Sequence, residues 1–496
     1  RLDRLRRSSA CEVVPMVNYG FVIDNRTCIG CHACTVACKS EHDVPIGVNR
    51  THVKYIETGT YPNTSREFSV HRCNHCEDAP CTTICPTTAL FTRSDGIVDF
   101  DDDRCIGCKS CMQACPYDAL YIDPNQGTAA KCNYCAHRIE HSYEPACVIV
   151  CPTESIVSGD LDDPNSTIAL RIAQNDVKVR KAEAGTKPNV FYVETSDAML
   201  DPAATAVTGI GMWTEQAHGV GHFAKYADSR LAEADTPSML VQLALEKKAR
   251  NANPRDQAII RDVMSKLEED TPSAKRTYDQ PSKGILWDSE VAAYIVTKAA
   301  ASGFYILMML LMMNGFTEID WLLFPGFFVS IALLGITGLL LVKDLDKPAR
   351  FLYVMLRPNW DSWLVRGAYI LTAFGGVLSA HVAISWFEAP DIWHTRLAYL
   401  GIPLAWMTGA YTGWLLKQAK GRAKWAERSD FNIAFESTIE MLLFGGAPFI
   451  GLWLLGWQQP ELTTILGIAA GLLAIYWVCF SHIRSGLREA QMEPLL

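Results

Sequence analysis

Cysteines spaced two or three residues apart point most directly to chemistry in this sequence. They form four runs before residue 152, and the first and third runs follow C-x2-C-x2-C-x3-C. Three thiolates on such a tight loop can surround one corner of a 4Fe-4S cluster, while the fourth reaches the neighbouring cluster. The runs therefore predict four 4Fe-4S clusters held in pairs. Their ligands are Cys28, Cys31, Cys34, Cys38, Cys73, Cys76, Cys81, Cys85, Cys105, Cys108, Cys111, Cys115, Cys132, Cys135, Cys147 and Cys151.

Two other uses of cysteine fit the spacing less well. Disulfides between thiols only two residues apart are geometrically unreasonable. Structural zinc prefers two separated C-x2-C pairs and explains neither the third cysteine of a run nor the C-x3-C-P ending. Of the 18 cysteines, the runs leave only Cys11 and Cys479, which we expect to be an unligated thiol and a buried apolar side chain.

The positions of cysteine and tryptophan divide the chain into two chemically different halves. Residues 1–200 hold 17 of the 18 cysteines, whereas residues 287–496 hold 12 of the 13 tryptophans and most of the long apolar segments. The length of 496 residues allows two or three domains, and the formal charge of -9 gives no reason to expect a nucleic-acid partner.

The cysteine runs also carry a family resemblance within residues 17–196. The stretches CIGCHACTVACKSEHDVP, CNHCEDAPCTTICPTTAL, DRCIGCKSCMQACPYDAL and KCNYCAHRIEHSYEPACVIVCPTESIVSGDLDDPNS resemble the electron-transfer subunit of the DMSO, polysulfide and tetrathionate reductase class of molybdenum enzymes. This resemblance implies one ligand set per cluster, named here by its first cysteine. The Cys28 set is Cys28, Cys31, Cys34 and Cys151; the Cys132 set is Cys132, Cys135, Cys147 and Cys38; the Cys73 set is Cys73, Cys76, Cys81 and Cys115; the Cys105 set is Cys105, Cys108, Cys111 and Cys85.

We expect four segments along the chain: an extension over 1–16, a ferredoxin-like domain with the clusters over 17–199, a linker over 200–285, and a transmembrane domain over 286–496. The fold class is thus an α+β double-ferredoxin-like domain followed by an all-α bundle of about six helices. The linker has helical spacing and mixed charge, which predicts one or two surface helices. His218 and His222 within it are expected to lie in a loop, since no third metal ligand has motif spacing.

Six apolar segments are long enough to cross a bilayer core of about 30 Å, which takes about 20 helical residues. Tryptophans at their ends match the aromatic belts of membrane interfaces. The segments lie at 291–313, 321–342, 367–387, 397–416, 439–457 and 462–480.

The basic residues between these segments gather on one side of the membrane. The positive-inside rule predicts that this side, which also carries the iron–sulfur domain, faces the cytoplasm. We expect the membrane to be the inner membrane of a prokaryote. A competing explanation is that these loops are basic because they hold the iron–sulfur domain and a quinone head. The arginine-rich start, RLDRLRRSSACEVV, has no apolar core and does not read as a signal peptide.

A second resemblance lies in this half. The stretches LLLVKDLDKPARFLYVMLRPNWDSWLVRGAYIL and MTGAYTGWLLKQAKGRAKW, within residues 285–483, are similar to the NrfD or polysulfide reductase membrane subunit. That family implies an anchor that exchanges electrons with menaquinone or ubiquinone without haem. Many members have eight spans where six are expected here, and the two subunits are fused in one chain.

Ionisable side chains within membrane spans are costly, so they are candidates for a quinone or proton site. Several have simpler explanations: Lys298 can reach a loop carbonyl, His381 can be a satisfied buried histidine, and Asp344 with Arg350 can fix a loop by a salt bridge. Glu436 and Glu440 are four residues apart and share a helix face. The candidates are Tyr294, Lys298, Asp344, Arg350, His381, Glu436 and Glu440.

Together these features predict an electron-transfer and membrane-anchor subunit of a quinone-linked oxidoreductase complex. Because no pterin-binding domain is recognisable, substrate chemistry is expected on a separate subunit with a molybdenum or tungsten pterin. Two alternatives stay open. One is a quinone oxidoreductase fed by a cytochrome or ferredoxin, and the other is a membrane scaffold whose helices bind no quinone.

Overall fold

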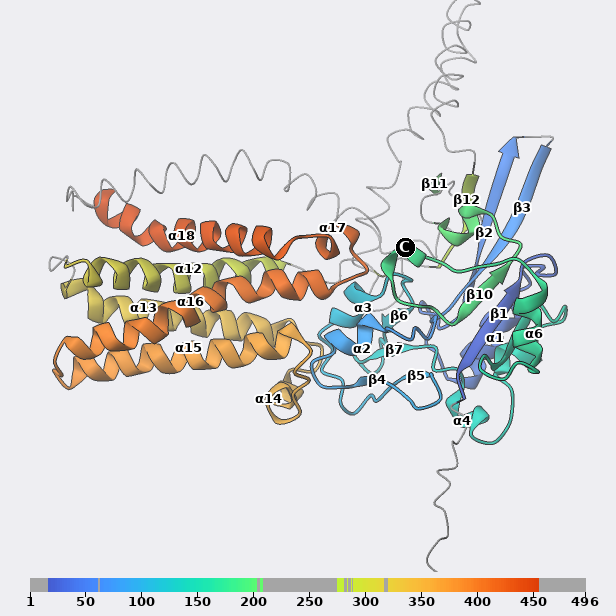
Figure 1. Cartoon of the computed structure of the whole chain (residues 1–496), viewed down its shortest axis with the longest axis horizontal. Coiled ribbons are helices and arrows are strands. Elements are labelled where there is room, and N and C mark those ends of the chain that lie inside the picture. The colour runs from blue at the N-terminus through green and yellow to red at the C-terminus, as the bar shows by residue number, and fades with distance from the viewer. Residues whose placement is uncertain are drawn as a thin grey trace, which may run out of the picture.

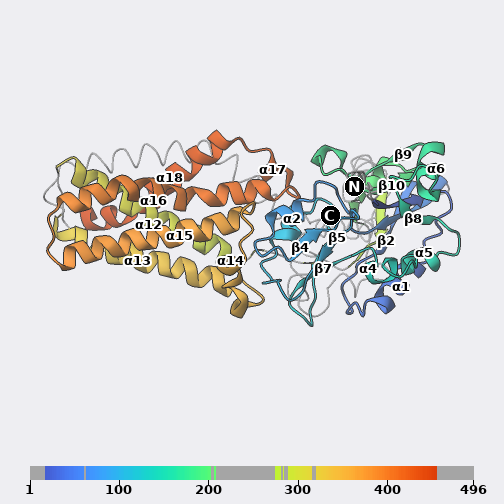
Figure 2. The ribbon, with the colours of Figure 1, turned by 60° about the horizontal axis from the view of Figure 1, so that its bottom comes forward.

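The computed structural model describes residues 17–60, 63–202, 206–207, 274–280, 283, 287, 289–315 and 320–454. These residues form two bodies side by side, a cysteine-rich domain and a bundle of long helices (Figures 1 and 2). The expected linker helices, His218, His222, the span at 462–480, Cys11 and Cys479 lie outside the described residues.

The cysteine-rich domain is built on two four-stranded sheets. In the first sheet, strand β1 lies between β8, to which it is antiparallel, and β10, to which it is parallel. In the second, β12 joins the long β2–β3 hairpin, so a segment after residue 273 completes the domain. The strands are β1 (Tyr19–Asp24), β2 (His52–Thr60), β3 (Asn63–His71), β8 (Ile156–Asp160), β9 (Val177–Lys178), β10 (Val190–Val193), β11 (Ala206–Val207) and β12 (Ala274–Tyr278).

Two small hairpins lie next to short helices that form part of the second and third cysteine runs. The hairpins are β4 (Leu90–Thr92) with β5 (Val98–Phe100), and β6 (Leu120–Ile122) with β7 (Ala129–Lys131). This mixture of short strands and helices agrees with the expected α+β class. The helices are α1 (Ala33–Glu41), α2 (Pro80–Ile84), α3 (Ser110–Ala114), α4 (Ala136–Ile139), α5 (Ala146–Ile149), α6 (Thr167–Gln174), η1 (Ala182–Ala184) and α7 (Asp197–Leu200).

In the part of the chain that the structure describes, the second body is a bundle of five long helices, which overlap the first five predicted spans; residues 455–457 of the fifth span lie outside the described part. They are α12 (Ser289–Met313), α13 (Asp320–Lys343), α15 (Trp363–Trp386), α16 (Ile392–Gln418) and α18 (Asp430–Leu454). Among the described residues, four helices are long and apolar enough to cross a membrane: α12, α13, α15 and α18. The chain therefore has the character of a multi-pass membrane protein.

All five helices begin earlier than the apolar segments predicted, and α16 and α18 differ most. Helix α16 starts at Ile392 instead of 397, and α18 starts at Asp430 instead of 439, with Asp430 in its first turn. Asp430 stabilises that turn, since a carboxylate interacts favourably with a helix N-terminus, and it accepts hydrogen bonds from Trp414 and Lys417.

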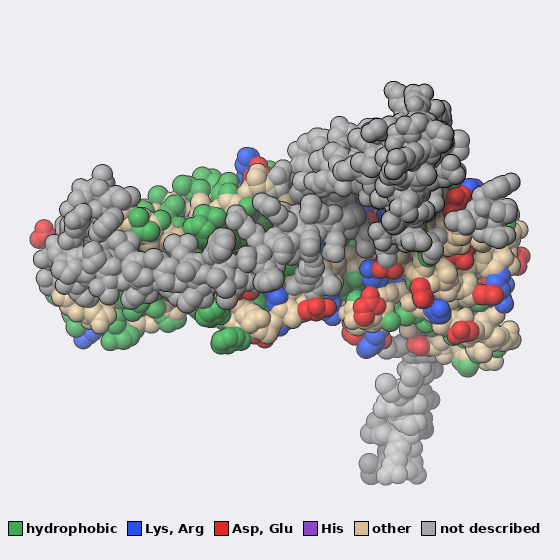
Figure 3. All heavy atoms as spheres, turned by 90° about the horizontal axis from the view of Figure 1, so that it is seen from above, with side chains coloured by type: hydrophobic (Ala, Val, Ile, Leu, Met, Phe, Trp, Pro, Cys, Tyr) green, Lys and Arg blue, Asp and Glu red, His purple; other side chains and the backbone are tan. Residues whose placement is uncertain are grey.

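The surfaces of the two bodies differ. Hydrophobic side chains cover much of the visible helix bundle, whereas acidic and basic side chains are scattered over the cysteine-rich domain (Figure 3). The outward-facing apolar residues of the bundle include Phe328, Ile336 and Leu339, the last of which is 72% exposed. A helix face that exposes large apolar side chains in this way is suited to lipid contact.

The bodies meet where the loop between α13 and α15 packs on the second and third cysteine runs. This loop carries the short helices η5 (Pro348–Arg350) and α14 (Tyr353–Leu356), and α17 (Ala423–Ala426) lies at the same junction (Figure 1). Asn359 donates a hydrogen bond to the carbonyl of Cys85 at 2.7 Å, and Ser362 donates one to the carbonyl of Ile84 at 2.7 Å. The helices are therefore attached directly to cluster-binding loops.

Candidate functional site

The first and third cysteine runs fold into the same tight turn. Gly30 and Gly107, which precede the second cysteine of each run, have φ of 67° and 71°. His32 and Lys109, which follow it, have φ of 60° and 59°. These left-handed conformations direct successive N–H groups toward the enclosed space, as in other sites that bind anionic groups. The similar sequences CIGCH and CIGCK thus give similar loops.

The structure places the fourth cysteine of each run among the thiols of another run. Burial raises the pKa of the Cys38 thiol, and the charges that raise it further come from the other three members of the Cys132 set. Burial also raises the pKa of Cys108 to about 12, and Cys85 is the first thiol that adds to this rise. In the remaining sets, Cys115 lies beside Cys81 and Cys151 beside Cys28.

This donor chemistry fits an iron–sulfur cluster. Burial raises the pKa of Cys76 to about 12 and that of Cys135 to about 12, so neither thiol ionises at neutral pH by itself. A bound metal centre supplies the positive charge that deprotonates such a thiol. Among the described residues, no three His, Cys, Asp or Glu side chains meet the spacing for a single metal ion. Four thiols drawn from two runs are the donor set that a 4Fe-4S cluster takes.

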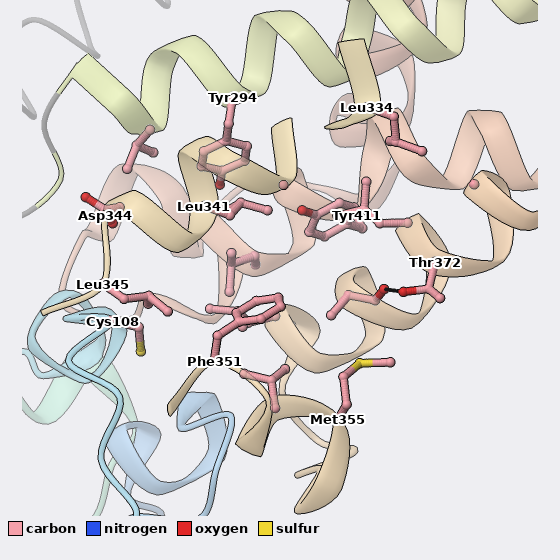
Figure 4. A pocket seen from close by; sticks show the side chains of 18 of the residues that line it. Cys108, Tyr294, Leu334, Leu341, Asp344, Leu345, Phe351, Met355, Thr372 and Tyr411 are labelled. Carbon is pink, nitrogen blue, oxygen red and sulfur yellow. Dashed lines mark hydrogen bonds between the residues drawn. The ribbon is translucent and has the colours of Figure 1, made fainter. Parts of the chain in front are cut away.

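A cavity of about 460 Å³ lies between the helices at their junction with the cysteine-rich domain. Its walls are mainly apolar side chains of α12, α13, α14 and α15, with Tyr411 from α16 (Figure 4). Its polar lining includes Tyr294, Asp344 and Tyr411. Cys108 also lines it, so the cavity touches a member of the Cys105 set directly. Apolar pockets with a few convergent polar groups are typical ligand sites.

Lys298 lies in the bundle core next to this cavity, but it is not among the residues that line it. Its side chain is 1% exposed, and its ammonium donates a hydrogen bond to the hydroxyl of Thr412. The nitrogen lies 4.2 Å from the ring centroid of Tyr411 and 5.8 Å from that of Tyr294. Lys298 does not line the cavity but packs against the two tyrosines that do.

Glu440 on α18 is the carboxylate that interacts electrostatically with Lys298. Glu436, one turn nearer the cysteine-rich domain, forms a 3.0 Å ion pair with Arg428. The three residues Lys298, Glu440 and Glu436 thus form a line of charge from the bundle core toward the domain junction. The two glutamates lie four residues apart and so share one face of α18, whereas Arg428 and Lys298, with which they interact, come from other segments.

His381 lies in a different part of the bundle. Its Nε2 is 2.9 Å from the Tyr305 hydroxyl and its Nδ1 is 2.8 Å from Nδ1 of His394. Both rings are buried and stack on Phe327. His381 does not line the cavity at the junction, so the sequence candidates fall into separate sites.

Arg350 also lies outside the cavity lining. Its guanidinium donates to the carbonyl of Asp102 at 2.6 Å and to that of Cys105 at 3.1 Å. It therefore attaches the loop after α13 to the third cysteine run, while the next residue, Phe351, lines the cavity.

Sequence reasoning missed four residues of these sites. Trp287, Phe351 and Tyr411 line the cavity, and His394 pairs with His381. Tyr411 and Phe351 lie inside the two stretches that carried the membrane-subunit resemblance, which was a usable signal. His394 precedes the apolar segment predicted as a span, and nothing in its neighbourhood marked it as buried.

Comparisons with known proteins agree with both halves. Residues 64–161 match the family model of the 4Fe-4S dicluster domain, and residues 278–429 match that of polysulphide reductase, NrfD.

Characterised relatives match the cysteine-rich half. A subunit of the tetrathionate reductase of Salmonella typhimurium is 43% identical over 195 residues, which are 38% of this chain and 78% of that protein. A subunit of the polysulfide reductase of Wolinella succinogenes is 42% identical over 178 residues, 35% of this chain and 93% of that protein. The arsenate respiratory reductase iron–sulfur subunit of a Shewanella species is 34% identical over 224 residues, 36% of this chain and 96% of that protein.

Proposed function

This chain is a member of the family of iron–sulfur subunits found in tetrathionate, polysulfide and arsenate reductases, continued by an NrfD region, and we propose that it transfers electrons between a separate catalytic subunit and a membrane quinone. The catalytic subunit carries a molybdenum or tungsten pterin, and the quinone is menaquinone or ubiquinone. The complex lies in the inner membrane of a prokaryote, with the cysteine-rich domain on the cytoplasmic side.

The proposed electron path runs through four 4Fe-4S clusters held by the Cys28, Cys132, Cys73 and Cys105 sets. Each cluster, when bound, accepts and returns one electron at a time. The chain joins the clusters in pairs, since each run contributes its fourth cysteine to another run's set. The Cys132 and Cys73 sets are buried, whereas Cys31 of the Cys28 set is exposed. We assign the cluster domain to residues 17–199, the linker to 200–285 and the membrane domain to 286–496.

The cavity beside Cys108 is the observation that carries the quinone assignment. Quinone reduction consumes two electrons and two protons, so its site must adjoin both an electron donor and proton donors. The apolar walls suit the ring, and the hydroxyls of Tyr294 and Tyr411 are the hydrogen-bond donors available to its carbonyl oxygens. Asp344 lines the same space near the domain junction (Figure 4).

Protons reach this site, in our proposal, along Glu436, Glu440 and Lys298. Glu436 lies nearest the junction, Glu440 acts electrostatically on Lys298, and Lys298 packs on both tyrosines. Ionisable groups buried in a membrane span are commonly retained for such transfer. Lys298 thus holds a proton next to the tyrosine that donates to the substrate.

Two glycines provide a direct test of the cavity. A side chain on Gly338, which lines it, meets no atom within 4 Å at its Cβ, and neither does one on Gly376, which does not line it. We expect Gly338→Phe to lower quinone-linked turnover at least about tenfold, equivalent to about 1.4 kcal/mol, by filling the space. Gly376→Phe is the matched control and should leave turnover unchanged.

Both variants should retain reduction of the clusters by dithionite, which shows that the cysteine-rich domain is intact. Unchanged quinone turnover in Gly338→Phe would reject the cavity as the quinone site and favour a membrane scaffold. Metal analysis of the detergent-purified complex tests the partner: about sixteen irons per chain with molybdenum or tungsten in a co-purifying subunit are expected. Iron and haem without a pterin metal would favour the cytochrome-linked alternative.

A further inference from the structure

Arg72 lies at the end of β3, immediately before the second cysteine run, and its side chain is 1% exposed. The guanidinium carbon lies 4.4 Å from the ring centroid of Phe21, a core residue of β1. The cation is therefore held in the interior of the cysteine-rich domain. Removing a guanidinium from water costs several kcal/mol unless opposite charge and hydrogen bonds compensate.

The charges that act most strongly on Arg72 come from cysteines, and His75, Tyr134 and Tyr192 also lie near it. Its Nη1 donates to the sulfur of Cys147 at 3.2 Å, and the charges that act on it come from Cys147, Cys132 and Cys34. Cys147 and Cys132 belong to the Cys132 set, whereas Cys34 belongs to the Cys28 set. A single buried cation is thus adjacent to two different ligand sets.

Two nitrogens of Arg72, Nε and Nη2, are buried and have no hydrogen-bond partner among the residues that the structure describes. Buried donors nearly always have a partner, so these point to an acceptor other than the residues that the structure describes. Another buried cation of the domain differs in this respect. The ammonium of Lys131 donates to the carbonyls of Val98 and Cys132.

We infer that Arg72 is a shared counter-cation for the clusters of the Cys28 and Cys132 sets, and that it raises the reduction potentials of both. The inference rests on the proposed presence of those clusters. Reduction adds negative charge to a cluster, and a fixed cation nearby stabilises the reduced form more than the oxidised form. Arg72 acts through the clusters and touches no substrate, so it is a positioning residue for electron transfer.

The test is an EPR-monitored redox titration of the detergent-purified full chain in three variants, with iron and acid-labile sulfide counted in each. Arg72→Met removes the charge and keeps the bulk, whereas Arg72→Lys keeps the charge. Arg180→Met is the matched control, because Arg180 is also buried, at 1% exposed, and its Nη1 also has no partner among the described residues, but its Nε donates to the carbonyl of Leu200 and not to a thiol.

In Arg72→Met we expect two of the one-electron couples to move to lower potential. At a fixed potential the reduced-to-oxidised ratio of those two clusters should fall at least tenfold, which corresponds to about 59 mV for a one-electron couple. The couple of the Cys105 set, none of whose thiols is among the charges named as acting on Arg72, should stay in place. Arg72→Lys should restore most of the shift, and Arg180→Met should show none.

Unchanged potentials in Arg72→Met with full iron content would overturn the inference. If Arg72→Met loses two clusters while Arg72→Lys keeps them, the positive charge is required and the inference stands. If both variants lose the clusters equally, shape rather than charge is what Arg72 supplies, and the inference is wrong. A wild-type protein purified with its iron–sulfur content absent would instead contradict the proposed function itself.

Discussion

The cysteine-rich domain and the helix bundle both bury a cation, but they compensate it differently. Arg72 in the domain faces thiols of the first and fourth cysteine runs, which the fold brings to it from distant parts of the sequence. Lys298 in the bundle meets Thr412 of α16 and the charge of Glu440 on α18, which also come from distant parts of the sequence. The fold assembles both environments, but the spacing of the cysteine runs marked the thiols near Arg72 in the sequence, whereas nothing marked Thr412 as a partner of Lys298.

This difference leads to unequal expectations for substitution. In the domain each ligand set consists of four cysteines, and each of them is needed to hold the cluster. Losing one should therefore abolish electron transfer through that cluster. In the bundle the polar groups line the cavity or pack against the residues that line it. Losing one should therefore slow proton transfer to the quinone without abolishing it. Three predictions test the contrast, in order of decreasing effect.

The largest effect is expected for Cys111→Ser, which removes a member of the set that adjoins the cavity. Replacing a residue that only supports a metal ligand commonly lowers metal affinity or activity about 10- to 100-fold. Losing the ligand itself should therefore lower quinone-linked turnover more than roughly 100-fold. Iron content should fall by about four per chain. Cys11→Ser, outside the runs, is the control, and an iron content equal to wild type in Cys111→Ser would contradict the ligand assignment.

A smaller effect is expected for Lys298→Met, which keeps the volume of the buried side chain and removes its proton. Losing a positioned proton donor or acceptor typically lowers the rate about 100- to 10,000-fold. The hydroxyls of Tyr294 and Tyr411 can partly replace Lys298, so quinone-linked turnover should fall only roughly 10- to 100-fold. Quinone-linked turnover and cluster spectra are measured together. Lys343→Met, at the exposed surface, is the control, and full turnover in Lys298→Met would remove the bundle from the proton path.

The smallest effect concerns acid sensitivity of the domain. Burial, followed by the nearby charge of Lys54, lowers the pKa of His52 well below its usual value, and the ring stacks on His71 at 5.1 Å. Below about pH 6.5 the unfolded protein binds a proton there that the folded protein does not, so stability falls as the pH falls. His52→Phe keeps the stacking and removes this proton.

The midpoint of thermal cluster bleaching, measured at pH 8 and pH 5.5, checks this expectation. Between pH 8 and pH 5.5 the bleaching midpoint should fall less in His52→Phe than in wild type. In a domain of this size, each kcal/mol of stability that His52 loses on acidification corresponds to about 2–4 °C in the midpoint. Equal drops in both proteins would show that His52 is not an acid-sensitive element of the fold.

The sequence predicted the positions of the long helices and of the four cysteine runs because both depend on short-range features, whereas the sharing of cysteines between runs came from the family resemblance. Apolar runs of about 20 residues form helices in a membrane wherever they occur. The sequence did not reveal that Arg350 binds the carbonyls of Asp102 and Cys105, since backbone acceptors carry no signature. Nor did it reveal the pairing of His381 with His394, which depends on how α15 and α16 pack.

By itself, the sequence identified the thiols that we propose as cluster ligands and the apolar segments that are able to enter a membrane, because the spacing of thiols and the length of apolar runs act locally. Only the tertiary structure decided which side chains meet at the cavity. Tyr294, Asp344 and Tyr411 come from three separate segments of the bundle, and Cys108 comes from the other domain. Their convergence depends on helix packing and on the contact between the two bodies, which no local pattern encodes.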